Sequence, residues 1–162
     1  MIVETEAYLG ANDMASHARR GHRSPRVESM YLEGGHAYVY LTYGMYHCMN
    51  VVTQEEGWAE AVLIRALEPV EGIERMFRNR PKAKRETDLA SGPGKLCMAL
   101  EIDRRLDGER LDGKRLYLTP RRRSISDDEV AISTRIGVEG AGEEAAAWPL
   151  RFHLRGNPHV SR

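Results

Sequence analysis

The segment that most constrains the fold is residues 2–10, IVETEAYLG, because it places two carboxylates inside a short apolar run. If the segment is a β-strand, side chains alternate between faces, so Glu4, Glu6 and Tyr8 share one face. A carboxylate beside an aromatic ring on a half-buried strand loses solvation, which raises its pKa and suits it to accept a proton. Alternatively, Glu4 and Glu6 face water on an edge strand, and the segment by itself favours this simpler interpretation.

The charges of the chain are balanced, with 24 Lys and Arg residues against 24 Asp and Glu residues. A net charge of zero does not indicate nucleic acid or a membrane as a partner. The basic residues are nevertheless clustered in 19–26, 75–85 and 121–123, apart from the acidic clusters. This separation permits a basic face on a neutral protein, although runs of charge are more often solvated surface.

The length of 162 residues suits a single domain over 1–162, and a monomer is the default expectation. Cys48 and Cys97 lack C-x-x-C spacing, which favours a reducing compartment. The sequence shows neither a signal peptide nor an apolar run of membrane-spanning length. We therefore expect an intracellular protein without membrane contact, in the cytoplasm or nucleoid if the source is bacterial. Because the chain opens directly on its most informative segment, a missing N-terminal segment is also expected.

Alternating and β-branched residues predict further strands, separated by glycine-rich turns. The expected strands are 37–42, 46–53, 61–66, 116–118, 130–135 and 151–154. Helical spacing predicts a helix over 70–80 and a second one opening at 95–100, while 13–17 is expected to form one helical turn in a long loop. Together these elements indicate one mixed α/β (α+β) domain with a mostly antiparallel sheet.

Residues 37–53 form a hairpin candidate whose tip is unusually apolar. The tip carries Tyr43, Met45 and Tyr46, where Asn, Asp, Ser and Gly are usual, and an exposed apolar tip requires a partner. Apolar side chains of this kind can fill the gap left by an extruded nucleotide, and aromatic rings can stack on its base. The alternative, which spacing alone favours, is that these tyrosines belong to a hydrophobic cluster on the sheet.

Several kinds of site are disfavoured by spacing. The histidines and cysteines show no zinc-ligand pattern, so no metal is expected. The sequence Gly92-Pro93-Gly94-Lys95 lacks the earlier glycine and the following Ser or Thr of a nucleotide-binding P-loop. No serine or cysteine lies in a nucleophile elbow. The remaining candidate is Glu6 with Tyr8, Tyr40 and His17 nearby, a set that suits a flat heterocycle.

A series of longer motifs covers almost the whole chain in a fixed order. They are IVETEAYLG with His17 following, GG-x-x-YVY, YGMYHCMNVV, AVLIRALEP, SGPGKL, RIGV and RF-x-x-RGN-x-x-VS. In these motifs the chain resembles the alkyladenine or 3-methyladenine DNA glycosylases of the mammalian AAG type. The resemblance implies a single mixed α/β domain with a curved, mostly antiparallel sheet, flanking helices and a protruding hairpin that enters the DNA minor groove.

The resemblance also implies roles for the residues of the base pocket. Glu6 would be the general base that activates water, with Glu4 as a structural neighbour, a choice that spacing alone leaves open. Tyr8 and Tyr40 would sandwich the flipped base, and His17 would hydrogen-bond to it. A further residue, Asn50, would crowd the exocyclic amino group of normal guanine.

For the DNA itself, the resemblance makes Tyr43 the residue that replaces the flipped nucleotide, assisted by Met45 and Tyr46. Arg65 would help to hold the attacking water and the adjacent phosphate, and Lys95 would contact the DNA backbone. Family members carry a further N-terminal helix and strand before the first motif. If that strand pairs beside residues 2–9, its absence here leaves an exposed sheet edge and makes the position of Glu6 less certain.

The activity implied is hydrolysis of the N-glycosidic bond of alkylated or deaminated purines in double-stranded DNA, without a cofactor. The lack of a nucleophilic lysine favours a monofunctional glycosylase. A module that recognises damaged or structured nucleic acid without catalysis, a small-molecule nucleoside hydrolase and an RNA-directed enzyme are the alternatives. Turnover of a lesion substrate separates an enzyme from the non-catalytic module. A nucleoside hydrolase would need the pocket but not the apolar hairpin tip, and its binding would not depend on salt. Discrimination of the RNA 2′-OH is not evident from these residues.

Overall fold

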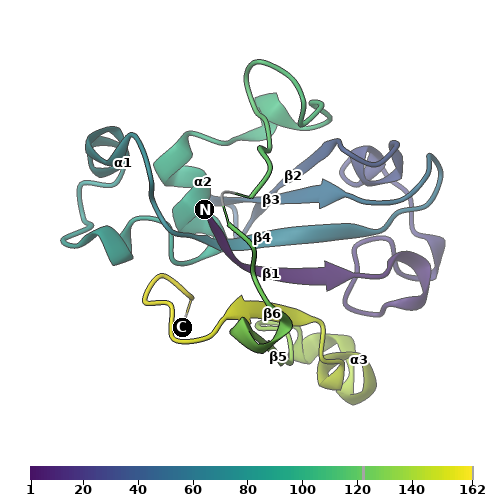
Figure 1. Ribbon diagram of the computed structural model, residues 1–162. Helices are drawn as coiled ribbons and strands as arrows, with labels where there is room; N and C mark the ends of the chain where they lie inside the picture. Colours follow the sequence, from purple (N-terminus) through teal and green to yellow (C-terminus); the bar gives the residue numbers. More distant parts are fainter. Residues whose placement is uncertain (122, 162) are drawn as a thin grey trace.

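Six antiparallel strands form one sheet in the order β2, β3, β4, β1, β6, β5, as the ribbon in Figure 1 shows. The structure, a computed structural model, describes residues 1–121 and 123–161. The strands are β1 (Ile2–Tyr8), β2 (Ala37–Thr42), β3 (Tyr46–Val52), β4 (Ala61–Leu67), β5 (Val130–Ser133) and β6 (Arg151–Leu154). The predicted α+β fold with an antiparallel sheet is therefore confirmed.

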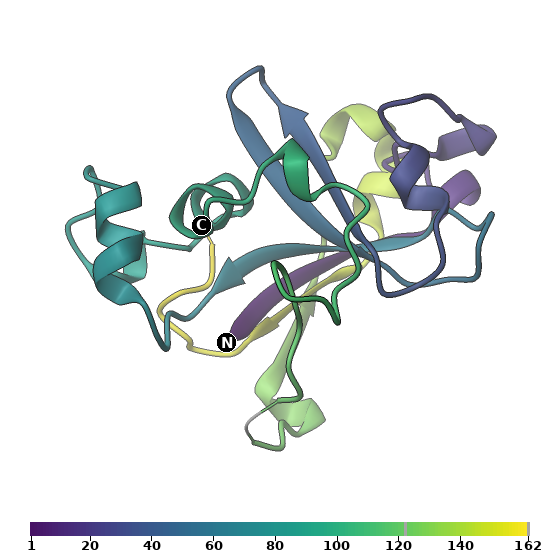
Figure 2. The ribbon, with the colours of Figure 1, turned by 90° about the horizontal axis from the view of Figure 1, so that it is seen from above.

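The helices are α1 (Ile73–Asn79), α2 (Pro93–Leu100) and α3 (Glu143–Ala147). Helix α2 packs on β3 and β4, and α1 lies on the outer side of α2 (Figures 1 and 2). The main hydrophobic core lies between α2 and the sheet, where Leu89, Leu96 and Cys97 are fully buried beside Val39 and Ile64. No helix within the described residues is long and apolar enough to cross a membrane.

Strand β1 is an interior strand, with β4 on one side and β6 on the other. It pairs with β4 along its whole length, and Glu4 to Glu6 also pair with β6. Glu4 is 1% exposed and Glu6 0%. The interpretation that both carboxylates face water on an edge strand is therefore wrong, and so is the expected exposed edge, because β6 from the far end of the chain occupies that position.

Most predicted elements are found with small shifts at their ends. The helix predicted over 70–80 begins at Ile73, because Gly72 precedes it with a left-handed φ of 71°. The helix expected at 95–100 begins earlier, at Pro93, since proline is favoured in the first helical turn. The expected strand 130–135 ends at Ser133.

Two local predictions are wrong. Residues 116–118 do not form a strand, because Tyr117 makes only an isolated bridge to Asp112. The helical turn expected at 13–17 is replaced by non-helical turns, and short 3-10 helices flank it at Gly10–Asn12 and Arg19–Gly21. In both places local turns and isolated bridges determine the backbone, and hydrophobic periodicity does not predict such structures.

The β2–β3 hairpin protrudes from the body of the molecule (Figure 2). Its turn has positive φ at both central residues, 50° at Tyr43 and 69° at Gly44, and Met45 N donates to Thr42 O at 3.2 Å. Glycine adopts this conformation readily, whereas a tyrosine there is strained. Tyr43 is nevertheless 85% exposed and Met45 66%, so the tip presents apolar side chains to solvent.

The packing of α2 predicts a contrast between two leucines of the same helix. Leu96→Ala removes a fully buried side chain from the main core and should lower the free energy of unfolding by about 2–5 kcal/mol. Leu100→Ala, at a residue 44% exposed, should cost about 1 kcal/mol or less. Urea unfolding of both variants measures the difference, and equal losses would contradict this account of the core.

Candidate active site

A β-bulge places the side chain of Arg65 between the two carboxylates of β1. On β4, Ile64 pairs with Thr5 and Ala66 pairs with Glu4, so Arg65 is the extra residue at this shift of register. Arg65 Nε donates to Glu4 Oε1 at 3.0 Å and Arg65 Nη1 donates to Glu6 Oε2 at 3.3 Å. Bulges redirect side chains in this way beside functional sites. One guanidinium thereby compensates two buried carboxylates.

Glu4 accepts hydrogen bonds from further donors. Arg151 Nε donates to Glu4 Oε1 at 2.7 Å. Ser161 donates from Oγ to Oε1 at 2.8 Å and from its backbone N to Oε2 at 2.6 Å. Burial by itself raises the pKa of Glu4, but the hydrogen bonds from Arg151 and Ser161 outweigh burial and lower the pKa. A carboxylate held ionised by this many donors is a structural counter-ion.

Glu6 has a different set of partners. Its Oε1 accepts from Ile136 N at 2.7 Å, and its Oε2 accepts from Tyr8 Oη at 2.9 Å as well as from Arg65. A carboxylate offers about four acceptor positions, so three donors leave one position on Oε1. Ile136 belongs to the RIGV motif, but the sequence interpretation gave it no role, because a backbone N–H has no side-chain signature.

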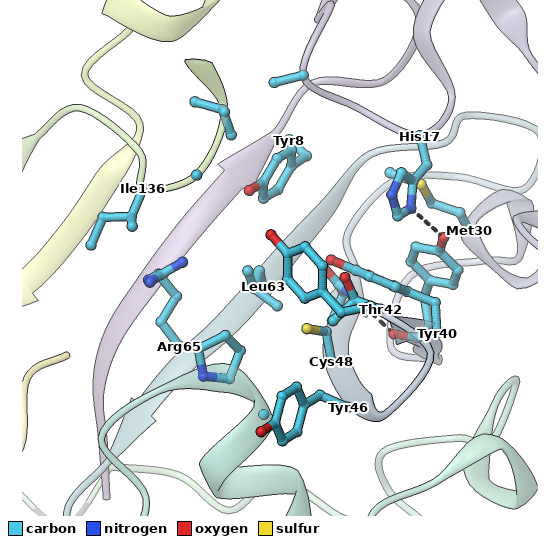
Figure 3. Close-up of a pocket in the computed structure, with 18 residues that line it drawn as sticks. Tyr8, His17, Met30, Tyr40, Thr42, Tyr46, Cys48, Leu63, Arg65 and Ile136 are labelled. Atoms are coloured by element: carbon cyan, nitrogen blue, oxygen red, sulfur yellow. Dashed lines mark hydrogen bonds between the residues drawn. The ribbon is translucent and has the colours of Figure 1, made fainter. Parts of the chain in front are cut away.

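A cavity of about 300 Å³ opens beside this network (Figure 3). It has the size of a small ligand pocket. Figure 3 shows Tyr8 and Arg65 on one side of the cavity and His17 on the other. Most of the residues predicted for the site line this cavity: Tyr8, His17, Tyr40, Tyr43, Tyr46, Asn50 and Arg65. Glu6 does not line the cavity but accepts hydrogen bonds from Tyr8, Arg65 and Ile136, which do. Met45 and Lys95 are not among the lining residues.

His17 is fixed by Tyr38, a residue that the sequence interpretation did not assign to the site. Nδ1 of His17 and Oη of Tyr38 are 2.7 Å apart, and the His17 ring packs edge-on against Tyr40 at 4.5 Å. Burial lowers the pKa of His17 to about 4, with further lowering from Arg26 and Arg19. The imidazole is therefore neutral at pH 7. The alternation of Tyr38 and Tyr40 on one strand was the available sequence signal.

The buried side chain of Asn50, which also lines the cavity, is held by a hydrogen bond. Asn50 pairs with Tyr38 across the hairpin, and its Nδ2 donates to the Tyr38 carbonyl at 3.0 Å. This bond opposes movement of Asn50 away from a bulky group that enters the cavity. The geometry suits exclusion of a ligand by contact.

The three apolar residues near the hairpin tip are not equivalent. Tyr43 and Met45 project into solvent, whereas Tyr46 packs on the start of α2. A Cβ added at Gly94 would lie 3.1 Å from Tyr46 Cβ, a tight contact that glycine avoids. The exposed side chains of Tyr43 and Met45 are called the wedge below, and Tyr46 packs at its base against α2.

Lys95 lies at the start of α2, with its Nζ 3.4 Å from Ser91 Oγ. It lines a second cavity of about 580 Å³ together with Arg80 and Lys82. This cavity adjoins the first, since Tyr46 and Arg65 line both. Four basic residues line it in all, beside a helix start, and give it a positive character. Within the described ranges, no group of three or more His, Cys, Asp or Glu residues has a metal-binding arrangement.

Comparison with known proteins assigns the chain to one family of enzymes. A family model described as methylpurine-DNA glycosylase matches residues 1–158. Proteins named "Putative 3-methyladenine DNA glycosylase" match at 48% identity in Desulfitobacterium hafniense, 48% in Methanocella arvoryzae and 47% in Bdellovibrio bacteriovorus. Each alignment covers 99% of this chain and 81%, 78% and 81% of the respective relative.

The lowered pKa of His17 predicts a pH dependence of stability. The unfolded chain binds the His17 proton near pH 6.5 and the folded chain only near pH 4, so protonation favours unfolding. The contribution of His17 is complete above about pH 6.5 and is lost as the pH falls toward 4.

Thermal melts of the wild type and His17→Gln at about pH 7 and about pH 4.5 test this expectation. The fall in melting temperature between the two pH values should be smaller in the variant, because the variant lacks the His17 imidazole. The other acid-sensitive groups remain in both proteins and contribute equally. Equal falls would show that His17 does not resist protonation in the folded state.

Proposed function

Because this chain belongs to the methylpurine-DNA glycosylase family, we propose roles for its site residues in the family's reaction. The protein is a monofunctional DNA N-glycosylase that acts on alkylated purines in base excision repair. It hydrolyses the bond between the damaged base and its deoxyribose and leaves an abasic site. The observation that carries our assignment is the position of Glu6, buried directly behind the cavity wall with one acceptor position open.

Glu6 acts as the general base. Water that reaches the open position on Oε1 can donate a proton there, while Arg65 and Ile136 N hold the carboxylate in place. Glu4 is the weaker base, because four hydrogen bonds from Arg65, Arg151 and Ser161 stabilise its ionised form and lower its pKa. Two carboxylates on one face of a strand thus receive separate functions from their different partners.

The chemistry needs only one carboxylate for a cationic substrate. As the C1′–N bond breaks, its electron pair neutralises the alkylated purine, and the sugar acquires oxocarbenium character. The water oxygen then bonds to C1′ and its proton passes to Glu6. A neutral deaminated purine must gain a proton to leave equally well. We include both kinds of purine among the substrates.

The cavity supplies recognition of the base. Tyr8 and Tyr40 line it with aromatic rings on which a flipped purine stacks, each such contact contributing about 1–3 kcal/mol. His17 presents a neutral imidazole for hydrogen bonding, because its pKa is lowered to about 4. Asn50, held by its bond to the Tyr38 carbonyl, crowds the exocyclic amino group of an undamaged guanine.

The exposed wedge favours double-stranded DNA over a free nucleoside as substrate. Tyr43 fills the gap left by the flipped nucleotide, and Met45 and Tyr46 support it. Lys95 contacts a backbone phosphate from the adjoining basic cavity.

One chain carries both the pocket and the wedge, which supports the expected monomer. A DNA substrate is likewise the reason to expect an intracellular location.

Glu6→Gln tests the general base. The amide keeps the size of the side chain but cannot take a proton, so release of a damaged purine should fall by about 10²–10⁴ while lesion binding persists. Single-turnover release from a lesion-containing duplex gives the rate, and gel-shift titration gives the affinity. Glu74→Gln, at an exposed residue of α1, is the matched control and should retain full activity. Retained release by Glu6→Gln would remove Glu6 from its role.

Tyr43→Ala tests the wedge. Loss of the exposed ring should weaken binding to a lesion duplex by about 1–3 kcal/mol, because the gap in the base stack is no longer filled. Tyr117→Ala removes another exposed tyrosine outside the cavity lining and should leave the affinity unchanged. Fluorescence anisotropy at fixed salt measures both. Equal affinities of the wild type and Tyr43→Ala would show that Tyr43 takes no part in binding the lesion duplex.

A further inference from the structure

A buried cation lies behind the aromatic ring of Tyr8. The guanidinium carbon of Arg135 is 4.8 Å from the centroid of the Tyr8 ring, and the Arg135 side chain is fully buried. Tyr8 lines the base cavity, whereas Arg135 does not. The ring therefore separates a fixed positive charge from the space in which a base would stack.

Arg135 is held in this position by three groups. It forms a buried ion pair with Asp13, and it donates from Nη1 to the Ala7 carbonyl at 3.0 Å and from Nη2 to the Ala145 carbonyl at 3.0 Å. Its Nε is buried without a hydrogen-bond partner in the part of the chain that is described. The cation is thus rigidly placed, and the ring face contributes to its compensation.

Asp13 is itself fixed, because its carboxylate also accepts from Leu9 N at 3.1 Å and Ala15 N at 2.9 Å. These bonds tie the loop before His17 to Arg135. The neighbour of Arg135, Ile136, donates its N–H to Glu6. The same short segment therefore supports both the stacking ring and the proposed base, although Arg135 does not line the cavity beside Tyr8.

The charge on Arg135 acts on the π system of Tyr8. Burial and the Glu6 carboxylate raise the pKa of Tyr8, while Arg135 and Arg65 act in the opposite direction. An aromatic ring attracts a cation through the negative potential of its faces, and a cation fixed on one face reduces that attraction on the other. The Asp13 carboxylate weakens this effect by partly neutralising Arg135.

We propose that the Arg135–Asp13 pair is a specificity-determining element that sets how strongly the pocket favours cationic alkylated purines over neutral deaminated purines. It does so by lowering the attraction of the Tyr8 ring for a positively charged base. Neutral purines, which stack by dispersion and area, are affected less. The proposal rests on the stacking role given to Tyr8 in the proposed function.

The readout is the ratio of kcat/KM for 7-methylguanine, a cationic base, to that for hypoxanthine, a neutral base, in the same duplex. Dividing each variant's ratio by the wild-type ratio removes the intrinsic difference in leaving ability. Arg135→Gln removes the cation and should raise the ratio by about two- to tenfold. Asp13→Asn leaves the cation less neutralised and should lower the ratio. Arg135→Lys keeps the cation and should stay within about twofold of the wild type.

Opposite shifts for Arg135→Gln and Asp13→Asn distinguish charge from packing, because a purely structural role would move both ratios alike or neither. Ratios that shift in the same direction, or a Lys variant that behaves like Gln, would overturn the proposal. If Arg135→Gln does not melt cooperatively, Asp13→Asn decides, since an unchanged or raised ratio overturns the proposal. Release of neither base by the wild type would overturn the proposed function itself, whereas unmoved ratios overturn only this inference.

Discussion

The compensation of buried carboxylates by arginines governs this structure. An isolated buried charge costs several kcal/mol, so Glu4 and Glu6 can lie inside the sheet only where cations reach them. Strand β4 supplies Arg65 and strand β6 supplies Arg151, one from each neighbour of β1. The central order β4, β1, β6 is thereby linked to the charge pattern of β1. Removing Arg65 would take the ion-pair partner from the buried Glu6 carboxylate, and a loss of this kind typically costs about 3–5 kcal/mol.

The same compensation gives the two carboxylates different surroundings, on which their proposed roles rest. Glu4 receives donors from three residues and ties the C-terminal segment to β1 through Ser161. Glu6 keeps one open acceptor position beside a cavity, which is what a proton acceptor needs. Rigid support of this kind costs no reorganisation during the reaction, because the hydrogen bonds exist before substrate arrives.

The hairpin carries both a residue of the proposed base pocket and the proposed wedge. Tyr40 lines the base cavity and Tyr43, three residues later, is the exposed tip. Tyr43 has a strained left-handed backbone and an exposed ring, whereas Tyr46 packs closely on Gly94 at the base of the hairpin. The proposed wedge therefore lies only a short distance along the chain from the proposed base pocket.

Local periodicity in the sequence determined much of this protein. Alternation placed Glu4, Glu6 and Tyr8 on one face, and the Tyr43 turn and its apolar tip were evident from residue types. Only the tertiary structure decided that this face is buried, that a bulge directs Arg65 between the carboxylates, and that Arg135 backs Tyr8. The physical reason is that periodicity is a property of neighbouring residues. The compensation of a buried charge depends instead on groups more than a hundred residues away, such as Ile136 for Glu6 and Ser161 for Glu4, brought together by strand order.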